Sequence, residues 1–367
     1  MMQKKKILFL INSLRGGGAE RVLVNLVNKL DKEKYDITVG VLFGDGVNKQ
    51  FLNPNIRVKR VYRKAPKGYV HIVKLFPSSL LHKYIVKEAF DVEVSFLQGV
   101  CTRIVGGAPK HIPIITWIHN FDHPERIFRS KTEKTNILRK SMAVACVSKY
   151  VAEKVIETGC DKANVKVIYN IQDFDSIISG AMEHVPEMER EDILKLISIG
   201  TLYNVKGYAR LINALAILRN EGKIFHMYFV GDGPQRQELE SMTKEKGMSD
   251  SITFFGFDKN PYKYLSKADM FICSSYTEGF SGVVSEATIL GVPTLTTRCA
   301  GMDEILGENN EYGIIVENSD EALYEGLKMV LSDATILQEY KNKVKERKDF
   351  FNPSTTIKVV EELIDSL

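Results

Sequence analysis

The chain has 367 residues, of which 44% are hydrophobic and 26% charged, a composition typical of a soluble globular protein long enough for two domains. Its apolar runs are all shorter than the ~20 residues that a membrane-spanning helix needs. Its net charge of +4 hides an asymmetry, since residues 1–150 hold 27 Lys and Arg against 11 Asp and Glu, and the rest holds 23 against 35. The basic first half therefore predicts an anionic partner.

Short apolar runs alternate with amphipathic segments along this first half. The run KILFLI at residues 6–11 predicts a buried strand, because it is too short for the hydrophobic region of a signal peptide. An amphipathic helix is predicted at residues 20–30, and further strands in ITVGVLF, VEVSFL, IPIITWI and AVACVS. Apolar strands separated by helices predict a parallel sheet that is covered on both faces.

The glycine-rich segment NSLRGGGAERV lies between the first strand and the first helix. Backbone amides at a helix start suit an anion, and glycine lets a phosphate approach closely, so Gly17 and Gly18 are candidate phosphate-binding residues. A dinucleotide fingerprint is the alternative. It would need a third glycine where Arg21 stands, and an acidic residue at the end of the second strand, which this chain lacks.

The stretch RVKRVYRKAPKGYVHIVKLF, residues 57–76, interleaves bases with aromatic and aliphatic residues. This pattern fits an anionic membrane surface or a nucleic acid, and a merely solvated basic face is the plainer alternative. We predict a membrane or acceptor surface formed by Arg57, Lys59, Arg60, Arg63, Lys64 and Lys67.

His119 stands at the carboxyl end of the predicted strand IPIITWI. Ligands of open α/β sheets bind beyond the carboxyl ends of strands, so His119 is a candidate catalytic residue. His123 lies four residues further on, but HNFDH lacks the H-E-x-x-H pattern of a helical zinc site, and we predict no metal site. The five cysteines include no C-x-x-C pair, which indicates reduced thiols in a cytoplasmic protein.

The same rhythm restarts at residues 195–200 and continues with strands in MYFVGDGP, ITFFG, DMFICSS and VPTLTT. Residues 171–193 are acidic and aperiodic, which predicts a linker with a domain boundary near residue 185. After Pro353, the segment STTIKVVEELIDSL is amphipathic and predicts a terminal helix capped by its serine.

The turns of the second half carry the remaining candidate residues. Lys206 precedes a helix, where its ammonium group can reach a phosphate, whereas the VGDGP turn is interpreted as structural. In TEGFSGVVSEA, Glu286 lies one turn into a helix and can accept two ribose hydroxyls, and Glu278 can accept sugar hydroxyls; each alone could merely interact with the helix dipole. Together they predict a nucleotide-sugar site formed by Gly17, Gly18, Lys206, Phe257, Glu278, Gly279, Phe280, Ser281, Gly282 and Glu286, with His119 and Glu278 catalytic.

The run EGFSGVVSEA resembles the E-x₇-E signature of glycosyltransferase family four. GGGAER, the His119 strand end, Asn170 in VIYNIQD, the KG of NVKGYARL and the VGDGP turn match that family in the same order. The resemblance implies the α/β GT-B fold, in which two Rossmann-like parallel-sheet domains face each other across a cleft. An acceptor-binding domain is expected at 1–175, a nucleotide-sugar domain at 190–350, and a helix crossing back to the first domain at 351–367.

The resemblance further implies a retaining, metal-independent hexosyltransferase without a cofactor. The expected donor is a UDP-linked hexose or N-acetylhexosamine, and the acceptor a glycan or a lipid diphosphate of bacterial surface polysaccharide assembly. Such a protein is expected in the cytoplasm, peripherally bound to the inner face of the cell membrane through its anionic lipids. No nucleic-acid partner is expected, since such a partner would leave Glu278 and Glu286 without a role.

One position departs from the family pattern. Thr201 stands where the family usually has the arginine of G-R-L-x-x-x-K-G, and Arg15, Arg21 and Arg298 are candidates to replace its charge. One alternative function is a nucleotide-sugar 2-epimerase of similar fold, which would need further acid and base carboxylates. The other is a non-catalytic partner subunit of a glycosyltransferase, which is favoured if Thr201 abolishes donor binding.

Overall fold

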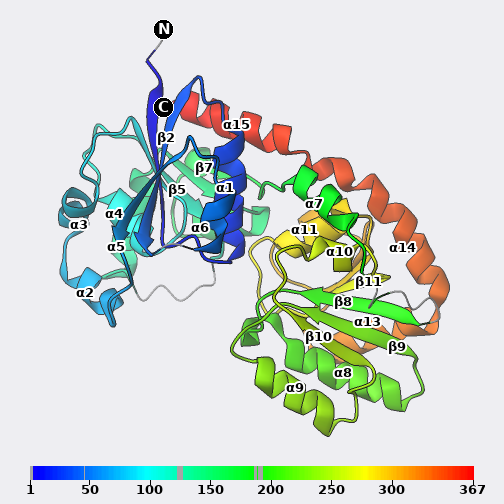
Figure 1. The fold of residues 1–367 in the computed structure, drawn as a ribbon. Coiled ribbons are helices and arrows are strands. Elements are labelled where there is room, and N and C mark those ends of the chain that lie inside the picture. Colours follow the sequence, from blue (N-terminus) through cyan, green and yellow to red (C-terminus); the bar gives the residue numbers. More distant parts are fainter. Residues whose placement is uncertain (1–2, 45, 122–126, 186–187, 189–192) are drawn as a thin grey trace. The chain divides into compact units, whose positions relative to one another are not determined.

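The computed structural model describes residues 3–44, 46–121, 127–185, 188 and 193–367, and Figure 1 shows its fold. The chain forms two compact units, one made of residues 1–171 and 353–367 and the other of residues 172–352. His123 and part of the predicted linker lie outside the described residues.

The first unit is built on a seven-stranded sheet in the order β3-β2-β1-β4-β5-β6-β7, in which every neighbouring pair is parallel. Its inner strands are buried along nearly their whole length, as continuous apolar runs require in a sheet covered on both faces. The strands are β1 (Lys5–Ile11), β2 (Tyr35–Phe43), β3 (Arg57–Tyr62), β4 (Val92–Ser95), β5 (Ile114–Ile118), β6 (Ala143–Cys146) and β7 (Val165–Val167).

Helices join these strands, and the last helix of the chain also belongs to this unit. They are α1 (Gly18–Lys29), α2 (Tyr69–Leu75), α3 (Ser78–Ile85), α4 (Val100–Gly106), α5 (Lys131–Lys140), α6 (Lys149–Glu157) and α15 (Pro353–Asp365), with the 3-10 helices η1 (Val47–Phe51) and η2 (Lys162–Asn164).

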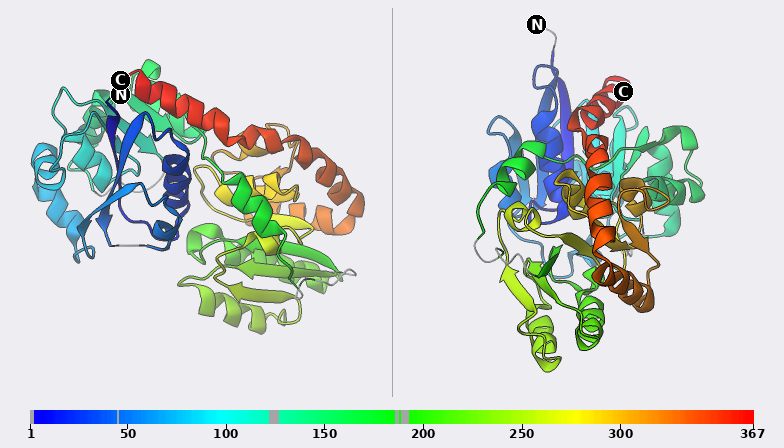
Figure 2. Two further views of the ribbon diagram at one scale, coloured as in Figure 1. Left: turned by 45° about the horizontal axis from the view of Figure 1, so that its top comes forward. Right: turned by 90° about the vertical axis from the view of Figure 1, so that its right-hand side faces the viewer.

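Helix α15 is attached to the first strands of the sheet. The Tyr35 hydroxyl donates to Asp365 Oδ1 at 2.7 Å, and Lys5 Nζ donates to the Ile364 carbonyl oxygen at 2.7 Å. Both views in Figure 2 show this terminal helix, in red, beside the blue strands. The helix begins at Pro353, so the predicted serine cap is wrong; proline suits a first helical position, where its missing N–H has no intrahelical partner to lose.

The second unit contains a six-stranded parallel sheet in the order β10-β9-β8-β11-β12-β13. Counted within the unit, this is 3-2-1-4-5-6, the order of dinucleotide-binding α/β folds. The strands are β8 (Leu194–Ile199), β9 (Phe225–Val230), β10 (Ile252–Gly256), β11 (Met270–Cys273), β12 (Thr294–Thr297) and β13 (Ile314–Val316).

The second unit starts earlier in the chain than the predicted boundary near residue 185. Its first helix is hydrogen-bonded to the segment around α10, since Asn260 Nδ2 donates to the Gly180 carbonyl oxygen at 2.9 Å and Ser266 Oγ to that of Ala181 at 3.0 Å. The helices are α7 (Phe174–Ala181), α8 (Tyr208–Asn220), α9 (Arg236–Glu245), α10 (Tyr262–Leu265), α11 (Gly282–Ile289), α12 (Met302–Leu306), α13 (Asp320–Ser332) and α14 (Ala334–Glu346), with the 3-10 helices η4 (Asn204–Lys206) and η5 (Lys348–Phe351).

The predicted fold class of two parallel α/β domains is confirmed, but three strands were not predicted. Strands β7 and β13 have only three residues each. Strand β3 lies at the sheet edge with alternating exposure, so its bases face water and no continuous apolar run marks it. Arg57, Lys59 and Arg60 therefore lie in a strand and not in an irregular polar segment.

Candidate functional site

Each sheet reverses its strand order beside its own first strand, between β1 and β4 in the first unit and between β8 and β11 in the second. Such reversals leave a crevice outside the carboxyl ends of the strands, where open α/β sheets bind ligands. The predicted site residues fall at these carboxyl ends in both units. Gly17, Gly18 and His119 belong to the first unit, and Lys206, Phe257, Glu278 to Gly282 and Glu286 to the second.

In the second unit the structure brings Lys206 and Glu278 into direct contact, although 72 residues separate them. Lys206 Nζ lies 2.7 Å from Glu278 Oε1, and the same carboxylate oxygen accepts the Ser275 hydroxyl at 2.7 Å. Lys206 follows β8 and Glu278 follows β11, so the pair stands at the reversal point. The two side chains are 28% and 14% exposed, and a ligand can therefore reach both of them.

The Lys206 ammonium group is strongly held in its charged form. Burial acts to lower the pKa of Lys206, but the adjacent Glu278 carboxylate, with smaller contributions from Cys273 and Cys299, raises it above its ordinary value. A permanent cation beside a carboxylate can bind an anionic group and a neighbouring hydroxyl at the same time.

Arg210, which is not among the predicted site residues, holds the segment that carries Glu278. This residue is 3% exposed, and its guanidinium donates to the carbonyl oxygens of Ser274 (2.9 and 2.7 Å) and Ser275 (2.8 Å). It also lies 3.9 Å from the centre of the Tyr276 ring. One signal was present in the sequence, because Arg210 interrupts the apolar face of ARLINALAIL, next to Leu211 and one turn before Ala214.

Gly207 brings α8 close to the same segment. Its φ of +66° lies in the left-handed region, and a Cβ atom there would collide with the Ser274 carbonyl oxygen. The Ser274 hydroxyl donates to the Lys206 carbonyl oxygen at 2.9 Å. Lys206 and Glu278 are thus placed by two turns that are bonded to each other, as a preorganised site requires.

Helix α11 begins at Gly282, four residues after Glu278. The Ser281 hydroxyl caps it by accepting the Val284 N–H at 3.4 Å. A Cβ atom on Gly282 would meet only the Gln172 side-chain amide, at 4.0 Å, so the helix start is open. An open helix start can bind a phosphate through its backbone amides.

The other predicted residues of the second unit lie around this helix. The Tyr262 hydroxyl donates to Glu286 Oε1 at 3.2 Å, a contact the sequence did not predict. Phe280 is buried at 5% exposure, whereas Phe257 is 62% exposed. Phe257 can therefore offer its ring face to a ligand, and Phe280 can contribute through its backbone.

The VGDGP turn supports the loop that follows β8. The Leu202 N–H donates to the Asp232 carbonyl oxygen at 3.0 Å, and the Gln235 N–H donates back to that of Leu202 at 3.1 Å. A Cβ atom on Gly233 would lie 2.6 Å from the Leu202 carbonyl oxygen, so this turn needs glycine for packing.

In the first unit, His119 follows β5 and packs 5.0 Å from the ring of Phe96. Its backbone N–H donates to Gln98 Oε1 at 3.1 Å. Its ring Nε2 is buried without a hydrogen-bond partner among the described residues. Burial lowers the pKa of His119 to about 4, against the opposing effect of a hydrogen bond with the Phe96 backbone. His119 is therefore neutral near pH 7, and its Nε2 is a buried polar atom that a ligand could bind.

The carboxylate of Glu20, which is not among the predicted site residues, lies beside the glycines at the start of α1. Glu20 lies so close to Gly17 that a Cβ atom there would collide with it, and it accepts the Ser13 hydroxyl at 3.4 Å. Burial raises the pKa of Glu20, while hydrogen bonds from its own N–H and from Ser13 act in the other direction. A phosphate at the Gly17 and Gly18 amides would therefore meet this carboxylate.

Of the three arginines proposed to replace the charge missing at Thr201, Arg298 is the one that belongs to the same unit as Lys206 and Glu278, and it is bound to other carboxylates. Arg298 is ion-paired with Asp303 (2.6 Å) and Glu317 (3.0 Å). Arg15 and Arg21 belong to the first unit, where Arg21 stacks 4.2 Å from the Phe51 ring centre. Lys206 is thus the cation that the described structure places beside Glu278.

The predicted basic surface is divided into two parts. Arg57 lies 3.1 Å from Glu88, which also pairs with Lys59, so these bases are partly neutralised. Arg63, Lys64 and Lys67 follow β3 in an exposed loop, and Lys67 lies in the turn that leads into α2.

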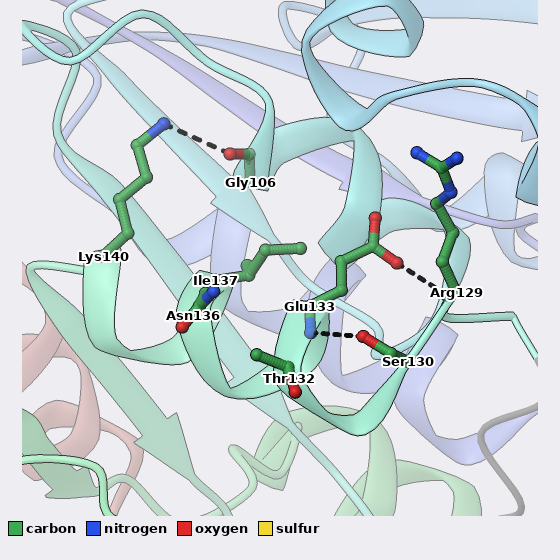
Figure 3. Close-up of a pocket in the computed structure, with 8 residues that line it drawn as sticks. All are labelled: Gly106, Arg129, Ser130, Thr132, Glu133, Asn136, Ile137 and Lys140. Atoms are coloured by element: carbon green, nitrogen blue, oxygen red, sulfur yellow. Dashed lines mark hydrogen bonds between the residues drawn. The ribbon is translucent and has the colours of Figure 1, made fainter.

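A pocket of ≈ 500 Å³ lies beside α5 in the first unit (Figure 3). Its lining includes Glu133, whose carboxylate accepts the Arg129 N–H and whose N–H donates to Ser130. None of the predicted site residues lines this pocket. Among the residues described, no group of three His, Cys, Asp or Glu side chains could hold a metal ion, and no helix is long and apolar enough to cross a bilayer.

Two family models match consecutive parts of the chain. Residues 16–175 match Glycosyltransferase Family 4, and residues 183–348 match Glycosyl transferases group 1. Each match takes in most of one parallel-sheet unit and its candidate residues.

Similar proteins extend over nearly the whole chain. One, of Campylobacter jejuni, is named N-acetylgalactosamine-N,N'-diacetylbacillosaminyl-diphospho-undecaprenol 4-alpha-N-acetylgalactosaminyltransferase and is 26% identical over 360 residues, 95% of this chain and 96% of its own. The lipopolysaccharide core biosynthesis glycosyltransferase LpsD of Rhizobium meliloti is 26% identical over 87% of this chain and 86% of its own.

Among solved structures, HepE of Anabaena in complex with UDP and glucose superposes with a TM-score of 0.81, at 21% identity over 99% of this chain and 100% of that one. This likeness shows that the two chains share a fold. With both parallel-sheet units matched by glycosyltransferase models and the whole chain matched by glycosyltransferases, the protein belongs to glycosyltransferase family four, of GT-B fold, and is a hexosyltransferase.

Proposed function

We propose that the protein transfers a hexose or N-acetylhexosamine from a UDP-sugar, with retention of configuration, to a lipid-diphosphate-linked glycan of bacterial surface polysaccharide assembly. The observation that carries this proposal is the Lys206–Glu278 pair at the start of α11. A cation, a carboxylate and open backbone amides in one place match the diphosphate and the sugar hydroxyls of such a donor.

The donor and acceptor classes are supported by the similar proteins. HepE was crystallised with UDP and glucose, and the Campylobacter jejuni relative is named for a diphospho-undecaprenol acceptor. The excess of Lys and Arg in residues 1–150 favours an acceptor on an anionic membrane, so we place the protein peripherally at the cytoplasmic face.

In the proposed reaction, cleavage of the sugar–phosphate bond leaves negative charge on the departing UDP. Lys206 and the α11 amides stabilise this charge electrostatically, which removes the need for a divalent ion or another cofactor. Glu278 accepts hydroxyls of the transferred sugar, and Glu286 accepts those of the ribose. Neutral His119 offers Nε2 as a hydrogen-bonding group to the sugar, and the acceptor attacks on the face that UDP leaves.

A nucleotide-binding and turnover experiment tests this function. Among UDP, ADP and GDP at equal concentration, UDP is expected to raise the melting temperature most, because ligand binding to the folded state stabilises it. Release of UDP from a panel of UDP-hexoses with a lipid-diphosphate acceptor should continue in EDTA. Loss of turnover in EDTA with recovery in Mg²⁺ or Mn²⁺ would contradict the metal-independent mechanism, and no response to any nucleotide would favour a non-catalytic subunit.

Glu286→Ala is expected to weaken UDP binding whatever the sugar. Its carboxylate is placed by Tyr262 and lies one turn into α11, where it can bind both ribose hydroxyls. Loss of hydrogen bonds to a charged group should cost about 1.5–3 kcal/mol, or roughly a 10- to 150-fold rise in Kd. Calorimetry with UDP checks this, with Glu304→Ala as the control on a different helix, and an unchanged Kd in Glu286→Ala would remove the ribose role.

A further inference from the structure

The helices α2 and α3 form a short hairpin, residues 69–85, which we call the α2–α3 hairpin; Figure 1 shows it beside α4 and α5 in the first unit. One face of the hairpin packs inward. Tyr69, Val70, Val73 and Ile85 lie against a core cluster that contains Leu81 and residues of α4 and α5. The hairpin is therefore a docked part of the unit.

Besides these packed residues, both helices of the hairpin carry exposed apolar side chains, three or four residues apart in each helix. Leu75 is 73% exposed and Tyr84 is 69% exposed, and large apolar side chains between them are exposed as well. A helix pair that is apolar on both sides is expected to be covered on both sides. We call this the outer face and define it by Ile72, Leu75, Phe76, Leu80 and Tyr84.

Bases predominate around the outer face, where Glu88 pairs with two of them, Arg57 and Lys59. Residues 57–87 contain nine Lys and Arg and no Asp or Glu. Lys67 lies before α2, and Lys83 and Lys87 lie in and after α3, all of them exposed. Exposed apolar side chains bordered by bases match the interface of an anionic bilayer, where apolar groups enter the acyl boundary and ammonium groups remain at the phosphates.

A buried arginine keeps the hairpin in this arrangement. Arg103 is 0% exposed and donates to the carbonyl oxygens of Val73 (2.7 Å) and Phe76 (2.9 Å), at the end of α2. Its guanidinium is paired with Glu133 at 2.8 Å, and Glu133 also accepts the Ser78 hydroxyl at 3.1 Å. Because the buried Arg103 side chain donates to the Val73 and Phe76 carbonyl oxygens, these groups need no polar partner from the outer face, which can therefore remain apolar.

Other occupants of the outer face fit less well. A second copy of the chain, packed face to face, would bring two regions of nine bases together, and like charges across an interface are repulsive. A nucleic acid would pair with the bases but would leave Ile72, Leu75 and Leu80 in water.

We propose that the outer face of the α2–α3 hairpin inserts into the acyl boundary of an anionic membrane, with the surrounding lysines on the lipid phosphates. This inference rests on the proposed membrane-borne acceptor and names the surface that reaches it. It differs from attraction by the bases alone, since salt screens charges but does not screen apolar insertion.

Sedimentation of the full chain with vesicles tests this. Binding to vesicles of phosphatidylglycerol and phosphatidylcholine is expected to fall only in part between 0.05 and 0.5 M NaCl, because the inserted side chains hold the remainder. Leu75→Glu with Ile72→Glu should lower the remaining binding at least tenfold. Ile224→Glu is the matched control, because Ile224 is 66% exposed in the second unit and should change nothing.

A second measurement does not depend on a loss of binding. Trp117 is the single tryptophan and is buried, so a Leu75→Trp variant adds one exposed indole. Its emission should shift to the blue with the anionic vesicles and should be quenched by brominated acyl chains. Unshifted emission of the Leu75→Trp variant would overturn the inference. So would vesicle binding of the double Glu variant that equals binding of the native chain. A native dimer that the double Glu substitution converts to a monomer, without loss of vesicle binding, would also overturn it.

The proposed function can fail independently of this surface. Sugar transfer to a short, soluble acceptor should be the same in the double Glu variant and the native chain, since Ile72 and Leu75 are not among the residues proposed to bind the donor. Vesicle binding without any sugar transfer would reject the function and keep the surface, whereas equal loss of transfer on soluble and vesicle-borne acceptors would reject insertion as the role of the outer face.

Discussion

Replacing Lys206 by alanine is expected to lower kcat for sugar transfer by about 100- to 1,000-fold, the usual effect of removing one preorganised group that stabilises developing charge. Lys206 Nζ is 2.7 Å from Glu278, and its permanent charge is available to the departing diphosphate. With Thr201 in place of the usual arginine, Lys206 is the cation that contacts Glu278 within the described part of the second unit. The loss in kcat should therefore exceed the loss in affinity for the intact donor.

Steady-state kinetics with a UDP-sugar and calorimetry with UDP measure the two effects separately. Lys206→Arg should restore part of kcat, because it keeps the charge but changes its geometry. Lys223→Ala is the matched control, since Lys223 belongs to the same unit and its exposed ammonium group donates to the Ser332 hydroxyl at 2.8 Å. Turnover of Lys206→Ala within a few-fold of the native chain would show that the diphosphate is neutralised elsewhere.

Replacing Arg210 by methionine is expected to lower both the free energy of unfolding and the rate of sugar transfer. The substitution leaves the buried Ser274 carbonyl oxygen without its donor, at about 1–3 kcal/mol. It also removes one of the donors to the Ser275 carbonyl oxygen, which still accepts the Thr297 hydroxyl at 2.6 Å and the Cys299 thiol at 3.3 Å. The Ser275 hydroxyl orients Glu278, so movement of this segment displaces the carboxylate as well. Arg210 is thus a positioning residue that acts through Ser274 and Ser275.

Hydrogen exchange of the peptide that contains residues 270–282 should report this loosening directly, with faster exchange in Arg210→Met than in the native chain. Arg210→Lys should rescue little, because one ammonium group cannot span two carbonyls in the way a guanidinium does. Arg236→Met is the matched control: Arg236 forms surface pairs with Asp232 and Glu240, and such pairs contribute at most about 1 kcal/mol. Unchanged exchange in Arg210→Met, with kcat lost, would instead indicate direct contact of Arg210 with the donor.

The sequence by itself determined the two-fold repetition of strands and helices and the residue types at the strand ends. Continuous apolar strands and amphipathic helices are local patterns, and the burial of β1 and β2 follows from them. Lys206, Glu278 and Glu286 were predicted because each stands beside a turn or a helix start that follows a predicted strand, and open α/β sheets bind ligands beyond the carboxyl ends of strands.

The tertiary structure decided which of these residues meet. The contact of Lys206 with Glu278 spans 72 residues and depends on β8 and β11 being neighbours, which no local pattern specifies. Arg210 was not selected for the same reason, because a lone arginine in a helix becomes a positioning residue only when distant carbonyls surround it. Likewise, the bases at 57–60 belong to an edge strand, which no continuous apolar run marked in the sequence. The exposed apolar side chains of α2 and α3 could be identified only from the structure, which shows which other side chains of these helices pack against α4 and α5. Burial of a side chain is a property of the whole packed unit, and sequence periodicity predicts it only for residues whose neighbours lie close in the chain.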